Sequence, residues 1–323
     1  MISPRSQMIE WIEQGAIPAE RMDEALRLST VVPDGATWHA FLNKLLLCLG
    51  CLALAASAMF FIAYNWNDIG RFAKFGLVEV CMALAIYGYW KLGTQTLAAK
   101  MSLLVAALLS GVLLALYGQT YQTGADTWQL FFYWALLILP WVAIGRFAAL
   151  CLFWIALINL SLILYFRESR HFFWLLFSAS NGLTWIAFIL NTFALVVWEY
   201  LAKDYEWLNK RWATRLLAVA CGFAITFLAT FSVLDFKQTT ILALPVWAIW
   251  LAAFYIFYRT IQRDLFMLAG GCLSVIVVFT AFLGRVMLHH SDAGGFLILA
   301  LIVTGMGSGS AFWLKNIHRE WQS

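Results

Sequence analysis

The chain has 323 residues, of which 63% are hydrophobic and only 12% are charged. A soluble domain carries about 25% charged residues, so this composition excludes a water-exposed globular protein and indicates an integral membrane protein. The formal net charge of +4 is too small to favour nucleic acid as a partner. We therefore expect the lipid bilayer to be the main partner, with other membrane proteins as further candidates; the composition leaves the oligomeric state open.

Residues 1–40 are polar and predict a small cytoplasmic head of two helices. The first helix is expected over Ser6–Gln14, where Gly15 ends it, and the second from Pro18 to Leu28. A helical hairpin of this size has little core, so we expect it to rest on the membrane, on the rest of the chain or on a partner. No cleavable signal peptide is expected, because the first apolar run begins only near Phe41.

Ten apolar runs follow, and most have about the 20 residues that a helix needs to cross a bilayer. They are continuous rather than strictly alternating, which predicts helices and not barrel strands. The expected fold class is therefore all-α, a polytopic helical membrane protein with a transmembrane bundle over residues 41–323. The expected spans are Leu42–Tyr64, Phe72–Trp90, Ser102–Tyr117, Trp128–Ile144, Phe147–Tyr165, Phe172–Trp198, Leu216–Leu234, Ile241–Tyr258, Leu265–Leu283 and Gly295–Leu314.

Three features of these runs leave alternatives open. Only Gly145 and Arg146 separate the fourth run from the fifth. The sixth run is too long for one span and is polar over Ser178–Gly182, which predicts either a tilted or kinked helix or a broken segment that lines a cavity. The first four and last four runs have similar spacing, as parallel repeats in transporters do, which indicates a 4+2+4 arrangement.

The basic residues predict the orientation. With the N-terminus in the cytoplasm, 15 of the 21 Lys and Arg residues fall in cytoplasmic segments. Cytoplasmic loops are enriched in these residues, so we expect both termini inside and the bacterial cytoplasmic (inner) membrane as the location. The six on the other side are Arg71, Lys74, Arg167, Arg170, Lys237 and Arg285.

Glu79 is the ionisable residue that stands out within the apolar runs. A carboxylate at such a depth is costly, which makes it a candidate for relaying protons, binding a cation or holding a polar group of a substrate. The alternative is a glutamate that fixes helix packing through a hydrogen bond. The sequence indicates no partner for it.

Two polar turns are expected on the same membrane face as the start of the second run. One carries Asn65 and Trp66 before Arg71 and Lys74, and the other is Tyr117–Trp128. In the second turn, Asp126 or Thr127 is expected to cap the next helix, while the amides and hydroxyls nearby could line the mouth of a pocket. With Glu79, the candidate polar site is Asn65, Trp66, Arg71, Lys74, Gln119, Tyr121, Gln122 and Asp126.

Three segments resemble a bacterial membrane family, the domain of unknown function 2157. They are the head segment from Trp11 to Pro18 with Glu20, the Ala63–Trp66 turn with Arg71 and Lys74, and the run from Gly118 to Asp126. The resemblance covers roughly the first half of the chain, and the last of the three segments is the most specific. It implies a multi-pass membrane protein and no established activity.

Other patterns are weaker. Cys48 and Cys51 form a CxxC but lack a second pair for a metal, and His289, His290 and Asp292 lie in one loop. We expect no catalytic site, no metal and no cofactor. Charges of both signs with Trp207 and Trp212 predict that residues 199–215 are a cytoplasmic amphipathic connector on the bilayer surface.

Three functions remain open. One is a permease or channel-like carrier for a small polar solute or ion, in which Glu79 would take part. The second is a non-catalytic accessory or sensor protein that binds other membrane proteins. The third, an intramembrane enzyme on a lipid-linked substrate, has no recognisable nucleophile with its base, so we do not expect an enzyme.

Overall fold

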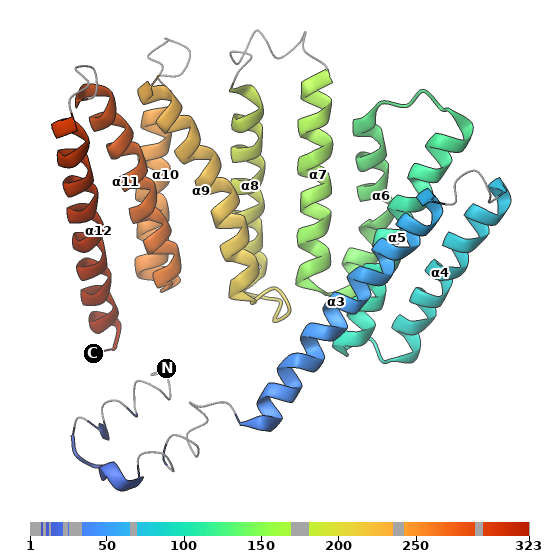
Figure 1. The fold of residues 1–323 in the computed structure, drawn as a ribbon, viewed down its shortest axis with the longest axis horizontal. Helices are drawn as coiled ribbons and strands as arrows, with labels where there is room; N and C mark the ends of the chain where they lie inside the picture. Colours follow the sequence, from blue (N-terminus) through green and yellow to red (C-terminus); the bar gives the residue numbers. More distant parts are fainter. Residues whose placement is uncertain are drawn as a thin grey trace. The chain divides into compact units, whose positions relative to one another are not determined.

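The computed structural model describes residues 8, 11–12, 14–21, 25, 34–64, 70–168, 181–234, 242–287 and 293–322. Within these ranges the chain is helical, and ten helices are long and apolar enough to cross a membrane (Figure 1). This confirms a polytopic helical membrane protein. The elements are η1 (Ala19–Arg21), α3 (Gly35–Tyr64), α4 (Arg71–Lys91), α5 (Leu97–Tyr121), α6 (Thr127–Gly145), α7 (Ala148–Glu168), α8 (Gly182–Leu201), α9 (Arg211–Leu234), α10 (Ala243–Ile256), the π-helix η4 (Phe257–Ile261), α11 (Leu265–Met287) and α12 (Ala293–Gln322).

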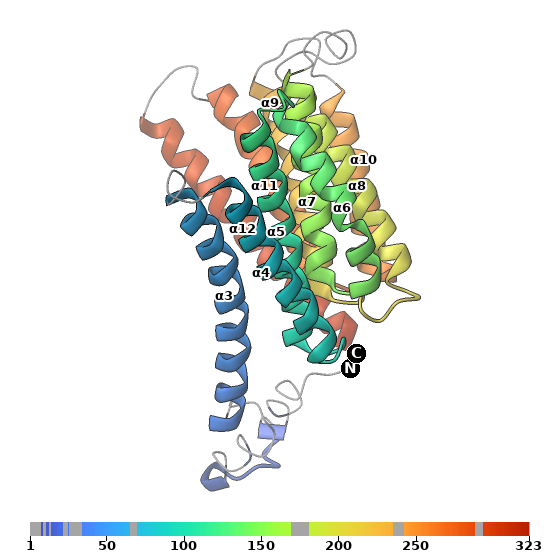
Figure 2. The same cartoon turned by 90° about the vertical axis from the view of Figure 1, so that its right-hand side faces the viewer.

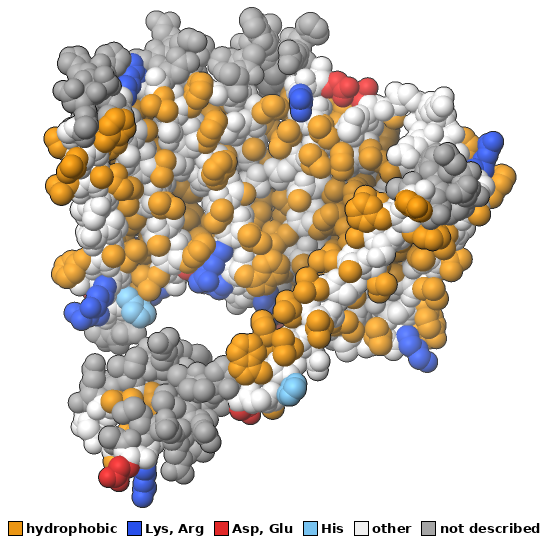
Figure 3. All heavy atoms as spheres, viewed as in Figure 1, with side chains coloured by type: hydrophobic (Ala, Val, Ile, Leu, Met, Phe, Trp, Pro, Cys, Tyr) orange, Lys and Arg blue, Asp and Glu red, His pale blue; other side chains and the backbone are white. Residues whose placement is uncertain are grey.

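The helices fit a bilayer by surface as well as by length. Large apolar side chains such as Leu54, Phe72 and Leu301 are exposed along them. In Figure 3, hydrophobic side chains cover the visible faces of the helices, while charged side chains appear near helix ends. Exposed apolar surface of this extent is stable in lipid and would aggregate in water.

Little of the predicted head falls within the described residues. Gly15 has φ of +70°, and its amide closes a turn onto the Ile12 carbonyl at 3.0 Å, as expected of the glycine that ends a helix. After Pro18, residues Ala19–Arg21 form one turn of 3₁₀-helix. Met8, Trp11, Ile12 and Ala25 are helical and Gln14 lies in a turn, while the other residues of the two predicted head helices lie outside the described ranges.

The chain forms two compact units, Met1–Thr120 and Tyr121–Trp321. The first unit contains α3, α4 and α5. Asp34 begins α3 by accepting a hydrogen bond from the Thr37 amide at 2.8 Å. Hydrogen bonds from the Thr37 hydroxyl and from this amide lower the pKa of Asp34. The core of the unit is a cluster around Val78, Leu109 and Leu116.

Helices α4 and α5 approach each other closely at a glycine. A Cβ atom at Gly88 would lie 3.2 Å from the Ser102 hydroxyl oxygen, so only a residue without a side chain fits there comfortably. Small residues allow two helix backbones to come together in a membrane, where van der Waals packing rather than the hydrophobic effect drives association.

The second unit is built around α9, which packs against α7, α8, α10 and α11. In Figure 1, α9 runs obliquely between α10 and α8, and Figure 2 shows the helices of this unit running in similar directions. The buried residues of α9 recur every three or four positions and many are small, including Ala213, Ala218, Cys221 and Ala224. This stripe lets four neighbouring helices reach one central helix.

Most of the predicted spans are present, but their boundaries differ from the apolar runs. Helix α3 starts seven residues before the predicted Leu42, and α8 starts at Gly182 rather than at Phe172. Residues 172–180 lie outside the described residues, so the choice between a kinked and a broken sixth span stays a prediction. The unit boundary in the last turn of α5 leaves the 4+2+4 arrangement a prediction as well.

The weakest predicted boundary, between the fourth and fifth runs, is a real turn. Helix α6 ends at Gly145, and Arg146 adopts a left-handed conformation with φ of 42° before α7 begins at Ala148. A single residue in this conformation reverses the chain direction. The two runs are therefore two helices, and they pack against each other.

Candidate functional site

Helix α4 places three of the predicted site residues on different faces. Lys74 is buried with 6% of its surface exposed, on the same side as the fully buried Val78. Arg71 and Glu79 are exposed. At 1.5 Å per residue, Glu79 lies about 12 Å along the helix from Arg71, within the span. The carboxylate therefore lies well inside the helix, as predicted, but on a face turned away from the core of its unit.

The second polar turn follows α5. Gln119, Tyr121, Gln122 and Asp126 are all exposed. Gln122 and Gly124 have positive φ angles of 44° and 64°, which make the turn tight.

Asp126 occupies the cap position of α6, but its side chain makes a different bond from the one expected. No backbone amide of the helix donates to it. Instead, the Trp128 indole donates to its carboxylate at 3.3 Å. The prediction of the cap position is confirmed, and the prediction of a capping hydrogen bond is wrong, because the indole two residues later takes the carboxylate oxygen.

Asn65 and Trp66 lie outside the described residues, as do His289, His290 and Asp292. The remaining candidates divide between the two units, so a shared polar face stays a prediction. Within the described ranges, no group of three His, Cys, Asp or Glu side chains converges as a metal site would require. All six cysteines are free thiols.

A different polar cluster, which we call the Glu199 cluster, joins three elements at one end of the second unit. Glu199, at the end of α8, is buried with 6% of its surface exposed. The Tyr258 hydroxyl donates to its Oε1 at 3.0 Å, and Arg211 at the start of α9 lies 3.7 Å from the same oxygen. Arg211 also donates to the side chain of Gln262.

A second ion pair lies at the same end of the unit. Arg215 donates two hydrogen bonds to Asp264, at 3.1 and 3.2 Å, and this carboxylate is buried. Asp264 also accepts a hydrogen bond from the Phe266 amide at 3.0 Å. The same carboxylate therefore caps α11 and binds Arg215 of α9. Bidentate arginine–carboxylate pairs are strong and fix geometry.

The segment between α8 and α9 lies within the predicted amphipathic connector, whose place on the bilayer surface stays a prediction. Residues 203–210 form a series of turns rather than a helix, while Arg211 and Arg215 belong to α9. The Trp198 indole donates to the Leu208 carbonyl at 3.0 Å, and Leu208 is buried in the core of the unit. The segment folds back onto the bundle because Leu208 gains more from this core than from an exposed position.

A groove of about 380 Å³ runs between α8 and α10 and reaches the Glu199 cluster; we call it the α8–α10 groove. Glu199 and Lys203 line one end of it, and Trp250 and Phe254 form much of one wall. The full lining is Thr192, Leu195, Val196, Glu199, Tyr200, Lys203, Trp250, Ala253, Phe254, Phe257 and Tyr258.

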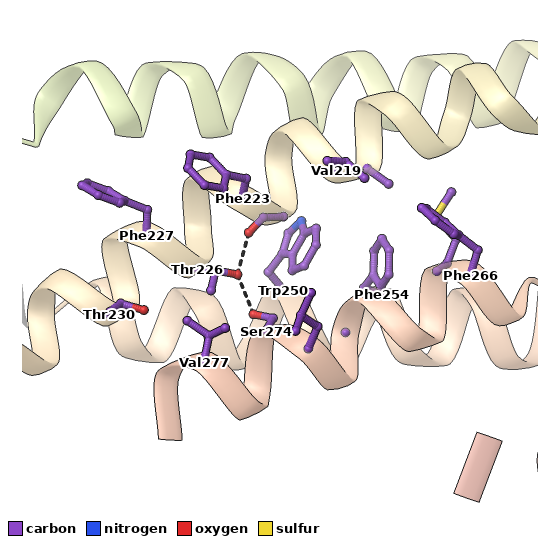
Figure 4. Close-up of a pocket in the computed structure, with 16 residues that line it drawn as sticks. Val219, Phe223, Thr226, Phe227, Thr230, Trp250, Phe254, Phe266, Ser274 and Val277 are labelled. Atoms are coloured by element: carbon purple, nitrogen blue, oxygen red, sulfur yellow. Dashed lines mark hydrogen bonds between the residues drawn. The ribbon is translucent and has the colours of Figure 1, made fainter. Parts of the chain in front are cut away.

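A second cavity of about 370 Å³, which we call the α9–α11 cavity, lies among α9, α10 and α11. Figure 4 shows Thr226 and Ser274 turned toward each other beside Trp250 and Phe254. The two hydroxyl oxygens lie 2.6 Å apart, and the Trp247 indole donates to Ser274 at 2.8 Å. These hydroxyls are already bonded within the protein, so the cavity offers a mostly apolar surface.

A pair of amides joins α7 to α8. Asn191 donates to the Asn159 carbonyl oxygen at 2.7 Å, and Asn159 donates back at 3.3 Å. Each amide also donates to a backbone carbonyl of its own helix, Ala187 for Asn191 and Ile155 for Asn159. Polar groups in a membrane span that are satisfied in this way hold helices together.

The sequence analysis did not select these residues. Glu199 was placed in a surface connector, and Asn159 and Asn191 were not considered. One available signal was an asparagine in the middle of an apolar run, which is as exceptional as Glu79. None of the seven predicted site residues that the structure describes lines the α8–α10 groove or the α9–α11 cavity.

The comparisons with known proteins concern the first part of the chain. The family model described as "Predicted membrane protein (DUF2157)" matches residues 9–151, which extend from the head to the start of α7. No curated protein and no solved structure matches the chain. All three segments on which the resemblance rested fall inside the matched range, so the resemblance to this family of membrane proteins is confirmed over residues 9–151.

Proposed function

We propose that the protein is a non-catalytic accessory or sensor protein that binds other membrane proteins. We also propose that it resides in a bacterial cytoplasmic membrane with both termini inside. The main support is that polar side chains within the spans of the second unit bond to one another between helices. The Asn159–Asn191 pair and the Thr226–Ser274–Trp247 group are the clearest cases.

A carrier for polar solutes needs polar groups that are open to the solute along its route. The α8–α10 groove and the α9–α11 cavity are walled mostly by apolar side chains. The two ion pairs described for α9 lie instead at one end of the second unit, where they join helices. These features favour a protein that binds over one that conducts.

A permease or channel-like carrier for a small polar solute or ion is the second candidate. Glu79 supports it, because an exposed carboxylate within a membrane span is costly unless it meets water, a cation or a polar partner. If the protein carries protons or cations, Glu79 is the residue that would bind them.

Flux through proteoliposomes separates the two candidates. We expect purified full-length protein to conduct protons, alkali cations and small polar solutes no faster than protein-free vesicles. We expect the same of Glu79→Gln and of the control Glu206→Gln, which changes an exposed carboxylate outside the spans. A flux in the unmodified protein that Glu79→Gln abolishes and Glu206→Gln preserves would establish the carrier instead.

Proximity labelling in cells tests the binding role directly. The full chain and a variant that lacks residues 1–32 are compared at equal expression in the membrane. We expect the truncated chain to lose at least one membrane protein from its labelled set. An unchanged set, together with an absence of flux, would count against both candidates.

A further inference from the structure

We propose that the α8–α10 groove binds one phospholipid whose head carries both a phosphate and a primary amine. The acyl chain would lie along the apolar part of the groove and the head at the end with Glu199 and Lys203. This inference does not depend on the proposed function, because an accessory protein and a carrier can each hold such a lipid.

The length of the groove matches one leaflet of a bilayer. Its lining on α8 extends from Thr192 to Tyr200, about 12 Å of helix, and Lys203 extends the lining in the turn that follows α8. The hydrocarbon core of a bilayer is about 30 Å thick, so the groove covers about half of it. A lipid in one leaflet spans this distance, whereas a transmembrane helix of a partner would need a groove about twice as long.

The charges of the groove lie at one end. Glu199 and Lys203 are four residues apart at the C-terminal end of α8, and both line the groove. The rest of the lining is mostly apolar, with Leu195, Val196 and Ala253 among its residues. This division into a charged end and an apolar body is that of an amphiphile.

The signs of the two charges favour a zwitterionic head. Lys203 is exposed and supplies an ammonium for a phosphate, while the carboxylate of Glu199 is more than nine-tenths buried. A head with a phosphate and no amine would bring a negative charge next to Glu199. A purely cationic head would instead meet Lys203. Only a head with both charges pairs with each residue.

The carboxylate favours a primary amine over a quaternary one. The described contacts of Glu199 with Tyr258 and Arg211 both involve Oε1, which leaves Oε2 for a ligand. A primary ammonium donates hydrogen bonds to such an oxygen, whereas a trimethylated ammonium has no N–H group. Quaternary ammonium groups bind best over aromatic rings, and the ring of Tyr200 already has the Lys203 ammonium 6.0 Å from its centroid.

Native mass spectrometry of the detergent-purified full chain tests the proposal. The probes are phosphatidylethanolamine, phosphatidylcholine and phosphatidylglycerol with identical acyl chains, added one at a time. We expect one tightly bound phosphatidylethanolamine, with an affinity about tenfold above that of the other two lipids, the difference that one hydrogen bond to a charged group gives.

Two alanines of α10 provide a matched pair of variants. Ala253 lines the groove and its neighbour Ala252 does not, and both are exposed. We expect Ala253→Trp to fill the groove and abolish the tight binding of phosphatidylethanolamine, and Ala252→Trp to leave it unchanged. Equal binding by the two variants would overturn the assignment of the site to this groove.

The charged residues are tested in the same way. Lys203→Gln is expected to lower the affinity for phosphatidylethanolamine two- to fivefold, as for the loss of an exposed ion pair. Lys210→Gln, in the same connector, is expected to leave this affinity unchanged. Glu199→Gln is expected to remove the preference over phosphatidylcholine. A preference that survives both Glu199→Gln and Lys203→Gln, or equal affinity for all three lipids in the unmodified chain, would overturn the proposal.

Discussion

The amides of Asn159 and Asn191 face each other inside two membrane spans, and each donates one hydrogen bond to the other and one to a backbone carbonyl of its own helix. Inside lipid no water is available to replace a lost partner, so a single substitution leaves one amide partly unpaired. The sequence could show that both residues interrupt apolar runs. It could not show that they meet, because the pairing depends on the rotation of α7 relative to α8 about their axes.

We predict that Asn159 and Asn191 are energetically coupled. Asn191→Leu and Asn159→Leu should each destabilise the protein, and the double variant should cost less than the sum of the two. The coupling should be about 1 kcal/mol, in the range of interhelical hydrogen bonds measured in membrane proteins. Unfolding of the purified protein in mixed micelles measures it.

Asn209→Leu is the control for this cycle, because Asn209 is exposed in the turns between α8 and α9. It should leave the unfolding midpoint unchanged. Strictly additive effects of the two buried substitutions would show that the amide pair does not stabilise the contact between α7 and α8.

Helix α9 is held at its first turns by two ion pairs, one to α8 and one to the start of α11. The sequence predicts that Arg211 and Arg215 lie at the cytoplasmic end of a span, and they do lie at a helix end. Their partners, Glu199 and Asp264, are distant in the sequence, and no periodic pattern relates them. Charge patterning could not reveal these pairs, and it therefore predicted that residues 199–215 form a surface connector.

We predict that Arg215→Gln destabilises the contact between α9 and α11. Asp264 is buried and Arg215 is partly exposed, with 3% and 42% of the side chains accessible. Without Arg215, the buried carboxylate of Asp264 keeps the hydrogen bond from the Phe266 amide and loses those from the guanidinium. We expect this to lower the free energy of unfolding by about 1.5–3 kcal/mol. Arg215→Lys keeps the charge without the bidentate geometry and should fall in between.

The midpoint of unfolding in mixed micelles again measures this cost. Arg263→Gln is the matched control, since Arg263 is an exposed arginine one residue before Asp264. If Arg215→Gln and Arg263→Gln lower the midpoint equally, the ion pair contributes nothing to the packing of α9 on α11.

At the scale of the whole molecule, hydropathy identifies ten spans because the bilayer demands long apolar helices wherever the chain crosses it. The ends of the helices were harder to predict, as α3 and α8 show, since polar residues can continue a helix into water. The candidate site was predicted from turns, whereas the structure brings its buried polar groups together through contacts between helices distant in the sequence. Such contacts leave no signal in hydropathy.

The orientation of the chain gives a further prediction. Three described helices, α6, α7 and α8, separate Asp126 from Lys210, so the two residues should lie on opposite sides of the membrane. In a variant without the six native cysteines, Asp126→Cys should react with an impermeant maleimide in intact cells. Lys210→Cys should react only after permeabilisation, because the distribution of the basic residues predicts that this connector is cytoplasmic.

The reverse pattern of labelling would mean that both termini lie outside. Labelling of both cysteines from one side would mean that the chain crosses the membrane an even number of times between them. Labelling of both cysteines from one side would therefore contradict the separation of α6 from α7 at Arg146.

Trp250 and Phe254 line both the α8–α10 groove and the α9–α11 cavity. Their rings are stacked with centroids 4.6 Å apart, and Phe254 continues to Tyr258 at 4.5 Å. The α8–α10 groove and the α9–α11 cavity are thus neighbours that share one aromatic wall. A smaller side chain at position 250 would connect the two volumes. A substitution of Trp250 therefore changes the shape of both the α8–α10 groove and the α9–α11 cavity.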